Sequence, residues 1–141
     1  MSTCHFTGVF ALLHAAGSAE AFIDSKLSAI GLSIPKLAAL RRLDEAGESL
    51  PLGQLAERLA CVKSNVTQLV DRLEADGLVA RAPDPNDRRS RLAVLTAAGR
   101  KACEEGLRVQ HEAEAKLLEA FSPAELSALT TIAAKLEVAH S

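Results

Sequence analysis

The segment that most constrains the fold runs from position 84 to position 95, where turn-forming residues precede an alternating apolar run. Proline presets φ, and Asn and Asp hydrogen-bond their own backbone, so Asp84-Pro85-Asn86-Asp87 predicts a tight turn. The following Leu92-Ala-Val-Leu-Thr is typical of a returning strand. The tip of the expected hairpin carries three arginines, Arg88, Arg89 and Arg91.

Two short helices are expected immediately before this hairpin, between Leu52 and Gly77. Their interior is predicted to contain Leu55, Ala56, Leu59, Val62, Val66, Leu69, Val70 and Leu73, the last four of which share one side of the second helix. The opposite side is polar and suits contact with base edges and phosphates in a major groove. The candidate DNA-binding residues are Lys63, Ser64, Asn65, Thr67, Gln68 and Arg72 on the helix and Asp87, Arg88, Arg89 and Arg91 on the hairpin.

Charge is polarised along the chain. The formal net charge is -2, yet the segment from Arg58 to Lys101 contains nine Lys and Arg against five Asp and Glu, a local charge of +4. The remainder of the chain therefore carries -6. A basic surface on an otherwise acidic protein attracts phosphates to one face, which favours duplex DNA as the partner over a merely solvated charge run.

Composition excludes several classes of protein. A length of 141 residues is enough for one domain, and the core must be aliphatic because there is no Trp, no Tyr and only four Phe. Binders of single-stranded nucleic acid depend on aromatic platforms, which this chain lacks. We also find no GxSxG, HExxH or GxxxxGK[ST] motif and no paired carboxylates in an apolar setting, so the chain is not expected to be an enzyme.

The cellular location expected from the sequence is the cytoplasm. No stretch approaches the roughly 20 apolar residues of a membrane span, and the first six residues lack the charged region of a secretory signal. The three cysteines have no CxxC spacing and are expected to be reduced thiols.

The rest of the chain has helical periodicity. Apolar spacing predicts helices over about residues 6–30, 33–47 and 96–121. A last helix is expected from Ser122-Pro123-Ala124-Glu125, which has the form of a capping box with proline at the first helical position. The two short helices and the hairpin are too small to cover all the apolar residues of these last two helices. The first and last helices of the chain are therefore expected to pack against a second copy of the chain.

The expected fold class is therefore mainly α, a winged helix-turn-helix with long N- and C-terminal dimerisation helices. We expect a single domain over residues 1–141, with a DNA-binding lobe at 33–96 and dimerisation helices at 1–30 and 97–141. A two-fold dimer presents its recognition helices to successive major grooves about 34 to 36 Å apart, so the expected operator is a pseudo-palindrome.

Residues from Leu50 to Lys101 resemble the MarR family of bacterial transcription regulators. The matching segments are Leu55-Ala-Glu-Arg-Leu59, Asn65 to Val79, Asp84-Pro-Asn-Asp-Arg-Arg-Ser90 and Leu95-Thr-Ala-Ala-Gly99. The resemblance implies a homodimeric regulator, usually a repressor released from DNA by a small ligand or by oxidation. It also implies that Asp87 orients Arg89 by a charge-assisted hydrogen bond while Arg89 enters the minor groove, with Arg88 and Arg91 on phosphates.

Several alternatives remain open at this stage. The resemblance implies a small amphipathic or phenolic effector, whereas Cys4 near the start of the first helix suggests a redox-sensing repressor, weakened by the absence of the tyrosines that peroxide-sensing relatives use. Cys61 and Cys103 are expected to be buried. A metal site built from His111, Glu112 and Glu114 with His14 or His5 is disfavoured, and no cofactor is expected. A winged-helix protein-interaction module that does not bind DNA is the remaining alternative.

Overall fold

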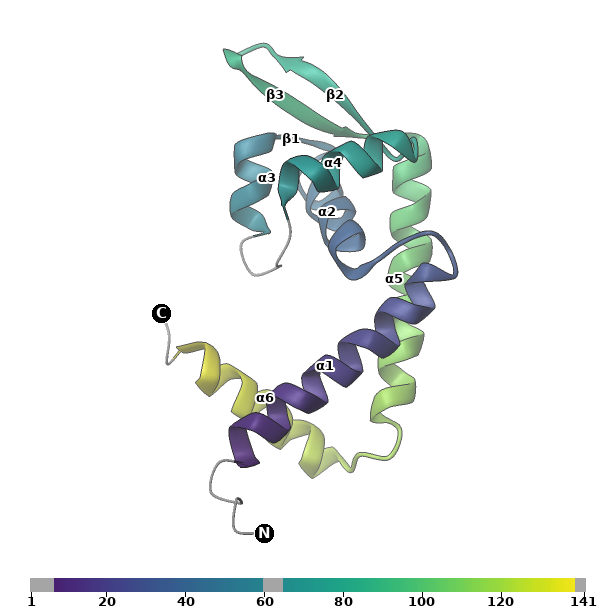
Figure 1. Cartoon of the computed structure of the whole chain (residues 1–141), viewed down its shortest axis with the longest axis vertical. Coiled ribbons are helices and arrows are strands. Elements are labelled where there is room, and N and C mark those ends of the chain that lie inside the picture. Colours follow the sequence, from purple (N-terminus) through teal and green to yellow (C-terminus); the bar gives the residue numbers. More distant parts are fainter. Residues whose placement is uncertain (1–6, 60–64, 139–141) are drawn as a thin grey trace.

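The computed structural model describes residues 7–59 and 65–138, which form six helices and three short strands (Figure 1). The helices and strands from α2 to β3, which we call the winged lobe, lie at one end, and long helices extend from them. The mainly α, winged helix-turn-helix fold is confirmed. In chain order the elements are α1 (Thr7–Ser28), α2 (Ile34–Glu45), β1 (Ser49–Pro51), α3 (Leu52–Arg58), α4 (Val66–Ala75), β2 (Val79–Asp84), β3 (Asp87–Leu95), α5 (Ala97–Leu118) and α6 (Pro123–Val138).

The core of the winged lobe is almost entirely aliphatic. Side chains from α2, α3, α4, β2 and β3 meet there, and each fully buried leucine contributes about 1.5–3 kcal/mol through the water it excludes. The buried face predicted for α4 is confirmed, but Ala56, predicted to lie between the two helices, is exposed. Val62 lies outside the described residues. The fully buried residues include Leu37, Leu40, Leu43, Leu55, Val70, Leu73 and Val79.

The sheet has the order β1-β3-β2, with β3 antiparallel to both neighbours. The hairpin of β2 and β3 is the predicted wing. The sequence analysis did not anticipate β1, whose residues Ser49, Leu50 and Pro51 pair with Val94, Ala93 and Leu92. A strand of three residues is too short to show the alternation from which strands are predicted. Its proline, which has no backbone N–H to donate, is tolerated because β1 lies at the edge of the sheet.

Side-chain oxygens cap the first turns of α2 and α6, close to residues 33 and 122 where these helices were expected to begin. Ser33 Oγ accepts a hydrogen bond from the Lys36 N–H at the start of α2, over 3.2 Å. At the start of α6, Ser122 Oγ accepts from the Glu125 N–H over 3.1 Å while a Glu125 carboxylate oxygen accepts from the Ser122 N–H over 2.9 Å. The second pair completes the predicted capping box.

The first turn of α5 packs closely against the root of the wing. Thr96 caps α5 by accepting from the Gly99 N–H, and its hydroxyl donates to the Gly77 carbonyl oxygen over 2.8 Å. Its backbone N–H donates to the Leu78 carbonyl oxygen over 3.1 Å. A Cβ placed on Gly99 would overlap that same carbonyl oxygen and lie 2.8 Å from Leu95 Cδ1. Only glycine therefore permits this approach.

We expect Gly99→Ala to lower the free energy of unfolding by about 1–3 kcal/mol, because the added methyl group must displace backbone at the wing root. The matched control is Gly53→Ala in α3, where a Cβ meets nothing within 4 Å. That change is expected to be neutral or to raise the free energy of unfolding by about 0.5–1 kcal/mol through helix propensity. Urea denaturation measures both variants, and an equal or greater stability of Gly99→Ala would contradict the close packing.

Candidate nucleic-acid interface

The helix expected to read DNA, α4, presents a polar outward face. Leu69, Val70 and Leu73 are buried, which leaves the opposite face of the helix directed to solvent. Thr67, Gln68 and Arg72 are exposed on it. Lys63 and Ser64, which were also predicted to contact DNA, lie outside the described residues.

Asn65 has a structural task in addition to its predicted contact with DNA. It is the N-cap of α4, and its side-chain oxygen accepts a hydrogen bond from the Gln68 N–H over 3.2 Å. That bond satisfies one of the backbone donors at the start of a helix that have no partner within it. Asn65 therefore stabilises the turn of α4 that displays Gln68.

The wing tip is asymmetric. The β2–β3 register is regular from Val79↔Leu95 to Pro83↔Arg91, and then shifts so that Asp84 faces Asp87. The shift leaves three residues of β3, 88–90, without register partners on β2. Such a bulge re-aims side chains away from the ladder. Two of the three predicted tip arginines, Arg88 and Arg89, lie within it.

Carboxylates shape this turn through the backbone. Asp84 Oδ1 accepts from the Asn86 N–H, and Asp87 Oδ1 accepts from the Arg89 N–H, each over 2.9 Å. The Asp87–Arg89 contact is thus with the backbone amide in the unbound chain, whereas a charge-assisted bond was predicted. Among the described residues, none of the ion pairs involves Arg88, Arg89 or Arg91, which are all exposed.

The wing and α4 lie at the same end of the molecule (Figure 1). The link between them is Arg81 on β2, a residue that the sequence analysis did not assign to the site. Its guanidinium donates to Asp71 and Glu74 on α4, both over 2.7 Å. The hydrogen bond that Arg81 donates to Asp71 is the main cause that raises the pKa of Arg81 above its usual value.

A hollow of about 270 Å³ lies between the start of α2 and the outward side of α4. Lys36, which lines this hollow, was not assigned to the site by the sequence analysis, because an isolated lysine in the first turn of a helix does not indicate a binding role. Its ammonium group forms a 3.0 Å ion pair with Asp76 at the end of α4. The lining residues are Ser33, Pro35, Lys36, Asn65, Gln68, Leu69 and Arg72.

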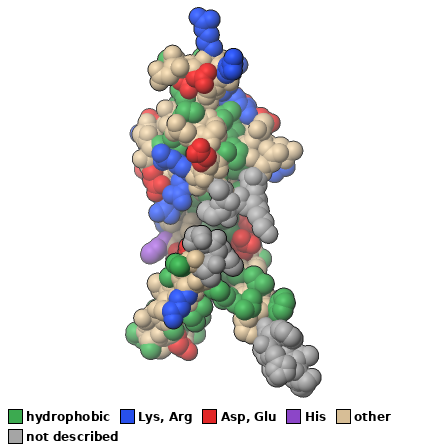
Figure 2. Space-filling view, turned by 90° about the vertical axis from the view of Figure 1, so that its left-hand side faces the viewer, with side chains coloured by type: hydrophobic (Ala, Val, Ile, Leu, Met, Phe, Trp, Pro, Cys, Tyr) green, Lys and Arg blue, Asp and Glu red, His purple; other side chains and the backbone are tan. Residues whose placement is uncertain are grey.

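The opposite end of the molecule is apolar. Every residue of α6 is exposed, and Figure 2 shows basic side chains at the wing tip and hydrophobic side chains gathered toward the far end. A groove of about 680 Å³ runs there between α1, α5 and α6. The large exposed apolar side chains are Val9, Phe10, Leu13, Phe121, Leu126, Leu129, Ile132, Leu136 and Val138.

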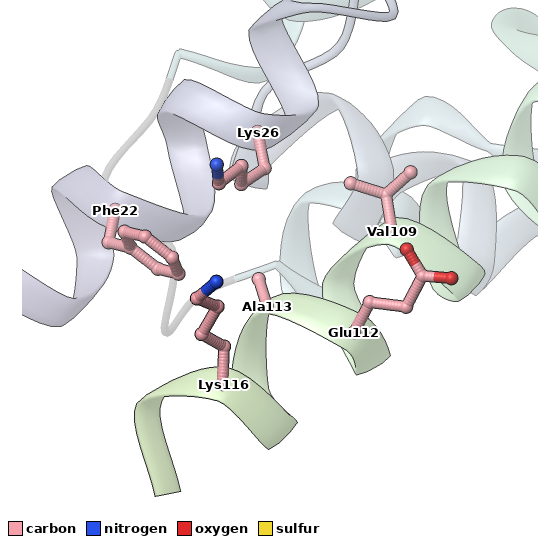
Figure 3. A pocket seen from close by; sticks show the side chains of 6 residues that line it. All are labelled: Phe22, Lys26, Val109, Glu112, Ala113 and Lys116. Carbon is pink, nitrogen blue, oxygen red and sulfur yellow. The ribbon is translucent and has the colours of Figure 1, made fainter. Parts of the chain in front are cut away.

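A smaller hollow of about 240 Å³ separates α1 from α5 (Figure 3). Phe22 and Lys26 on α1 and Lys116 on α5 point toward the space between the helices, and Glu112 lies toward the other end. Lys26 Nζ lies 5.2 Å from the centroid of the Phe22 ring, within the range of a cation–π contact. Val109 and Ala113 form the floor.

Cys103 is buried on α5, as predicted, and burial raises the pKa of its thiol. Cys4, Cys61 and His5 lie outside the described residues. Within residues 7–59 and 65–138, no group of three or more His, Cys, Asp or Glu is placed to hold a metal ion. The helices in the same ranges include none that is long and apolar enough to cross a bilayer.

Comparison with known proteins identifies the relatives of this chain. The model of the MarR family matches residues 32–90. The HTH-type transcriptional regulator YcgE of Bacillus subtilis is 33% identical over 114 residues, which cover 81% of this chain and 73% of YcgE.

Two solved structures share the fold. A mutant of MarR from Escherichia coli in complex with operator DNA has a TM-score of 0.79 at 21% identity, covering 95% of this chain and 99% of that one. BpsR of Bordetella bronchiseptica, whose DNA binding is regulated by 6-hydroxynicotinic acid, has a TM-score of 0.81 at 25% identity, covering 94% and 96%. The chain therefore belongs to the MarR family of winged helix-turn-helix transcriptional regulators.

Proposed function

We propose that this protein is a homodimeric repressor that binds a pseudo-palindromic site in promoter DNA. The observation that carries the proposal is the joint placement of exposed wing-tip arginines without ion-pair partners and the exposed polar face of α4 at one end of the molecule. Each structure element suits a different groove: α4 offers hydrogen-bonding side chains to the major groove, and the wing offers guanidinium groups to the adjacent minor groove.

The roles assigned to individual residues follow from their positions. Gln68 suits bidentate contact with an adenine, and Thr67 suits a polar base edge or a thymine methyl group. Arg72, Arg88 and Arg91 suit phosphates. Lys63 and Ser64, which lie outside the described residues, are proposed as further contacts with DNA. Asp87 holds the turn from which Arg89 reaches the minor groove. Repression follows from a dimer that occupies promoter DNA needed by the transcription machinery.

We expect Arg89→Ala to weaken binding to a duplex selected by the wild-type protein by about 1–3 kcal/mol, with little change in thermal stability, because the side chain is exposed. Fluorescence anisotropy at several salt concentrations measures this. Wild-type affinity should fall steeply with salt as counterions are released. Arg108→Ala on α5 is the control, because it also removes one positive charge but lies far from the wing tip. Unchanged affinity of Arg89→Ala would refute the wing contact, and salt-insensitive wild-type binding would favour the protein-interaction alternative.

The dimer proposal rests on the apolar far end. Leu13 and Ile132 expose 61% and 49% of their surface, and the groove between α1, α5 and α6 is lined mostly by Leu and Ala. Large exposed apolar patches mark sites of interaction with a protein or a membrane, and a protein partner is proposed here. A second copy supplies a matching surface, because a two-fold axis pairs each patch with itself.

We expect Ile132→Glu to shift the protein from dimer to monomer, because a dimer interface would bury the new carboxylate without a partner. Sedimentation velocity measures the oligomeric state, and far-UV circular dichroism checks that the fold persists. Thr131→Glu is the matched control, since helical periodicity turns it about 100° from Ile132 and away from the apolar stripe that includes Leu129 and Leu136. A dimer of unchanged stability in Ile132→Glu would place the interface elsewhere.

The hollow in Figure 3 is the best-supported effector site for a small aromatic acid. Lys26 and Lys116 supply positive charge for a carboxylate, and the Phe22 ring supplies a flat apolar surface. The site lies between α1 and α5, so a ligand there acts on the helix that continues directly into the wing root. Regulation of BpsR by 6-hydroxynicotinic acid, an aromatic acid, supports this class of ligand.

We expect 6-hydroxynicotinate to bind the wild-type dimer in calorimetric titrations, and Lys116→Met to weaken that binding about tenfold or more by removing a charge-assisted contact. The uncharged 6-hydroxynicotinamide is the matched ligand control and should bind far more weakly. Equal affinity of the acid for both proteins would exclude Lys116 from the site. Arg58→Ala on α3, which does not line the hollow, controls for the loss of one positive charge.

A further inference from the structure

We infer that Arg81 is a positioning residue for DNA recognition, which holds the wing and α4 at one fixed angle so that both reach the duplex together. The inference rests on the proposed function and adds to it a residue that does not itself touch DNA. It is carried by the geometry of one side chain that leaves β2 and ends on the recognition helix.

Three groups on one side of α4 receive the Arg81 guanidinium. Nη2 donates to Asp71 Oδ1 over 2.7 Å and Nη1 to Glu74 Oε1 over 2.7 Å, and Nη2 also lies 3.5 Å from the Thr67 carbonyl oxygen. Positions 67, 71 and 74 are spaced by four and three residues and so form a single row along the helix. The contact therefore spans about two turns of α4 and restrains its rotation as well as its distance from β2.

The same contact explains how two carboxylates are accommodated near a DNA-binding surface. Asp71 and Glu74 would repel phosphates if they were left unpaired. Their side chains are 59% and 44% exposed, whereas that of Arg81 is only 22% exposed. The Arg81 side chain is thus partly buried between strand and helix, with both terminal nitrogens engaged. Its positive charge offsets one of the two negative charges, and with both nitrogens engaged it is poorly placed to bind a phosphate itself.

Arg81 also lies where a small change in angle has a large effect. The root of the wing is held by Thr96 and Gly99 against α5, and Arg81 is the next attachment along β2. The tip, with Arg89, projects beyond it. A tilt of the hairpin about its root therefore moves Arg89 farther than it moves Arg81, so that loss of the contact would relax the spacing between the two groove-binding elements.

The test compares wild type, Arg81→Ala and Asp71→Asn on two DNAs: a duplex selected by the wild-type protein from a random library, and an unselected duplex. We expect both variants to lose about tenfold in affinity for the selected duplex and less than twofold for the unselected one. Asp71→Asn is informative because it removes a negative charge, which by charge alone would strengthen binding. The double variant should be no weaker than either single variant, since both changes break one contact.

Each other outcome decides against the inference in a distinct way. Equal losses on both DNAs, with a salt dependence reduced by about one phosphate contact, would make Arg81 a direct phosphate ligand. Unchanged affinity for the selected duplex would show that the angle does not depend on Arg81. Arg81→Lys keeps the charge but not the bidentate geometry, and it should give an intermediate loss in a folded protein even if Arg81→Ala unfolds. Failure of the wild-type protein to bind duplex DNA at all would instead overturn the proposed function.

Discussion

The contact between the first turn of α5 and the root of the wing is the constraint on which the rest of the structure depends. Gly77 ends the stretch that follows α4, Leu78 leads into β2, and the carbonyl oxygens of both accept hydrogen bonds from the same residue, Thr96. Gly99 lets α5 approach that backbone without a side chain between. The recognition helix, the wing and the long helix therefore meet at one point, and none of them can move far without moving the others.

This arrangement divides the molecule by charge and by polarity. The wing tip is cationic and the outward face of α4 is polar, while the far ends of α1 and α6 are apolar. α5 connects the two ends and also forms one wall of the hollow between α1 and α5. A ligand that changes how α1 and α5 pack thereby acts on the helix that anchors the wing. This connection is the physical route by which the proposed acid effector would alter affinity for DNA.

Local signals in the sequence predicted much of the fold. The caps at Ser33, Thr96 and Ser122, the hairpin turn at 84–87 and the apolar stripe of α4 each depend on residues that are close together in the chain. Features that depend on distant residues were missed. β1 exists only because β3 offers it a partner, and Ala56, although apolar and correctly spaced, is exposed.

By itself, the sequence determined which residues are candidates for binding DNA, because a run of arginines in a turn and a polar stripe on a helix are properties of short segments. It did not determine how those groups are aimed. Only the tertiary structure placed Arg81 against Asp71 and Glu74, and only there did Asp87 turn out to hold the Arg89 backbone. Both outcomes depend on the three-dimensional angle between strands and a helix, which side-chain packing sets and no local spacing encodes.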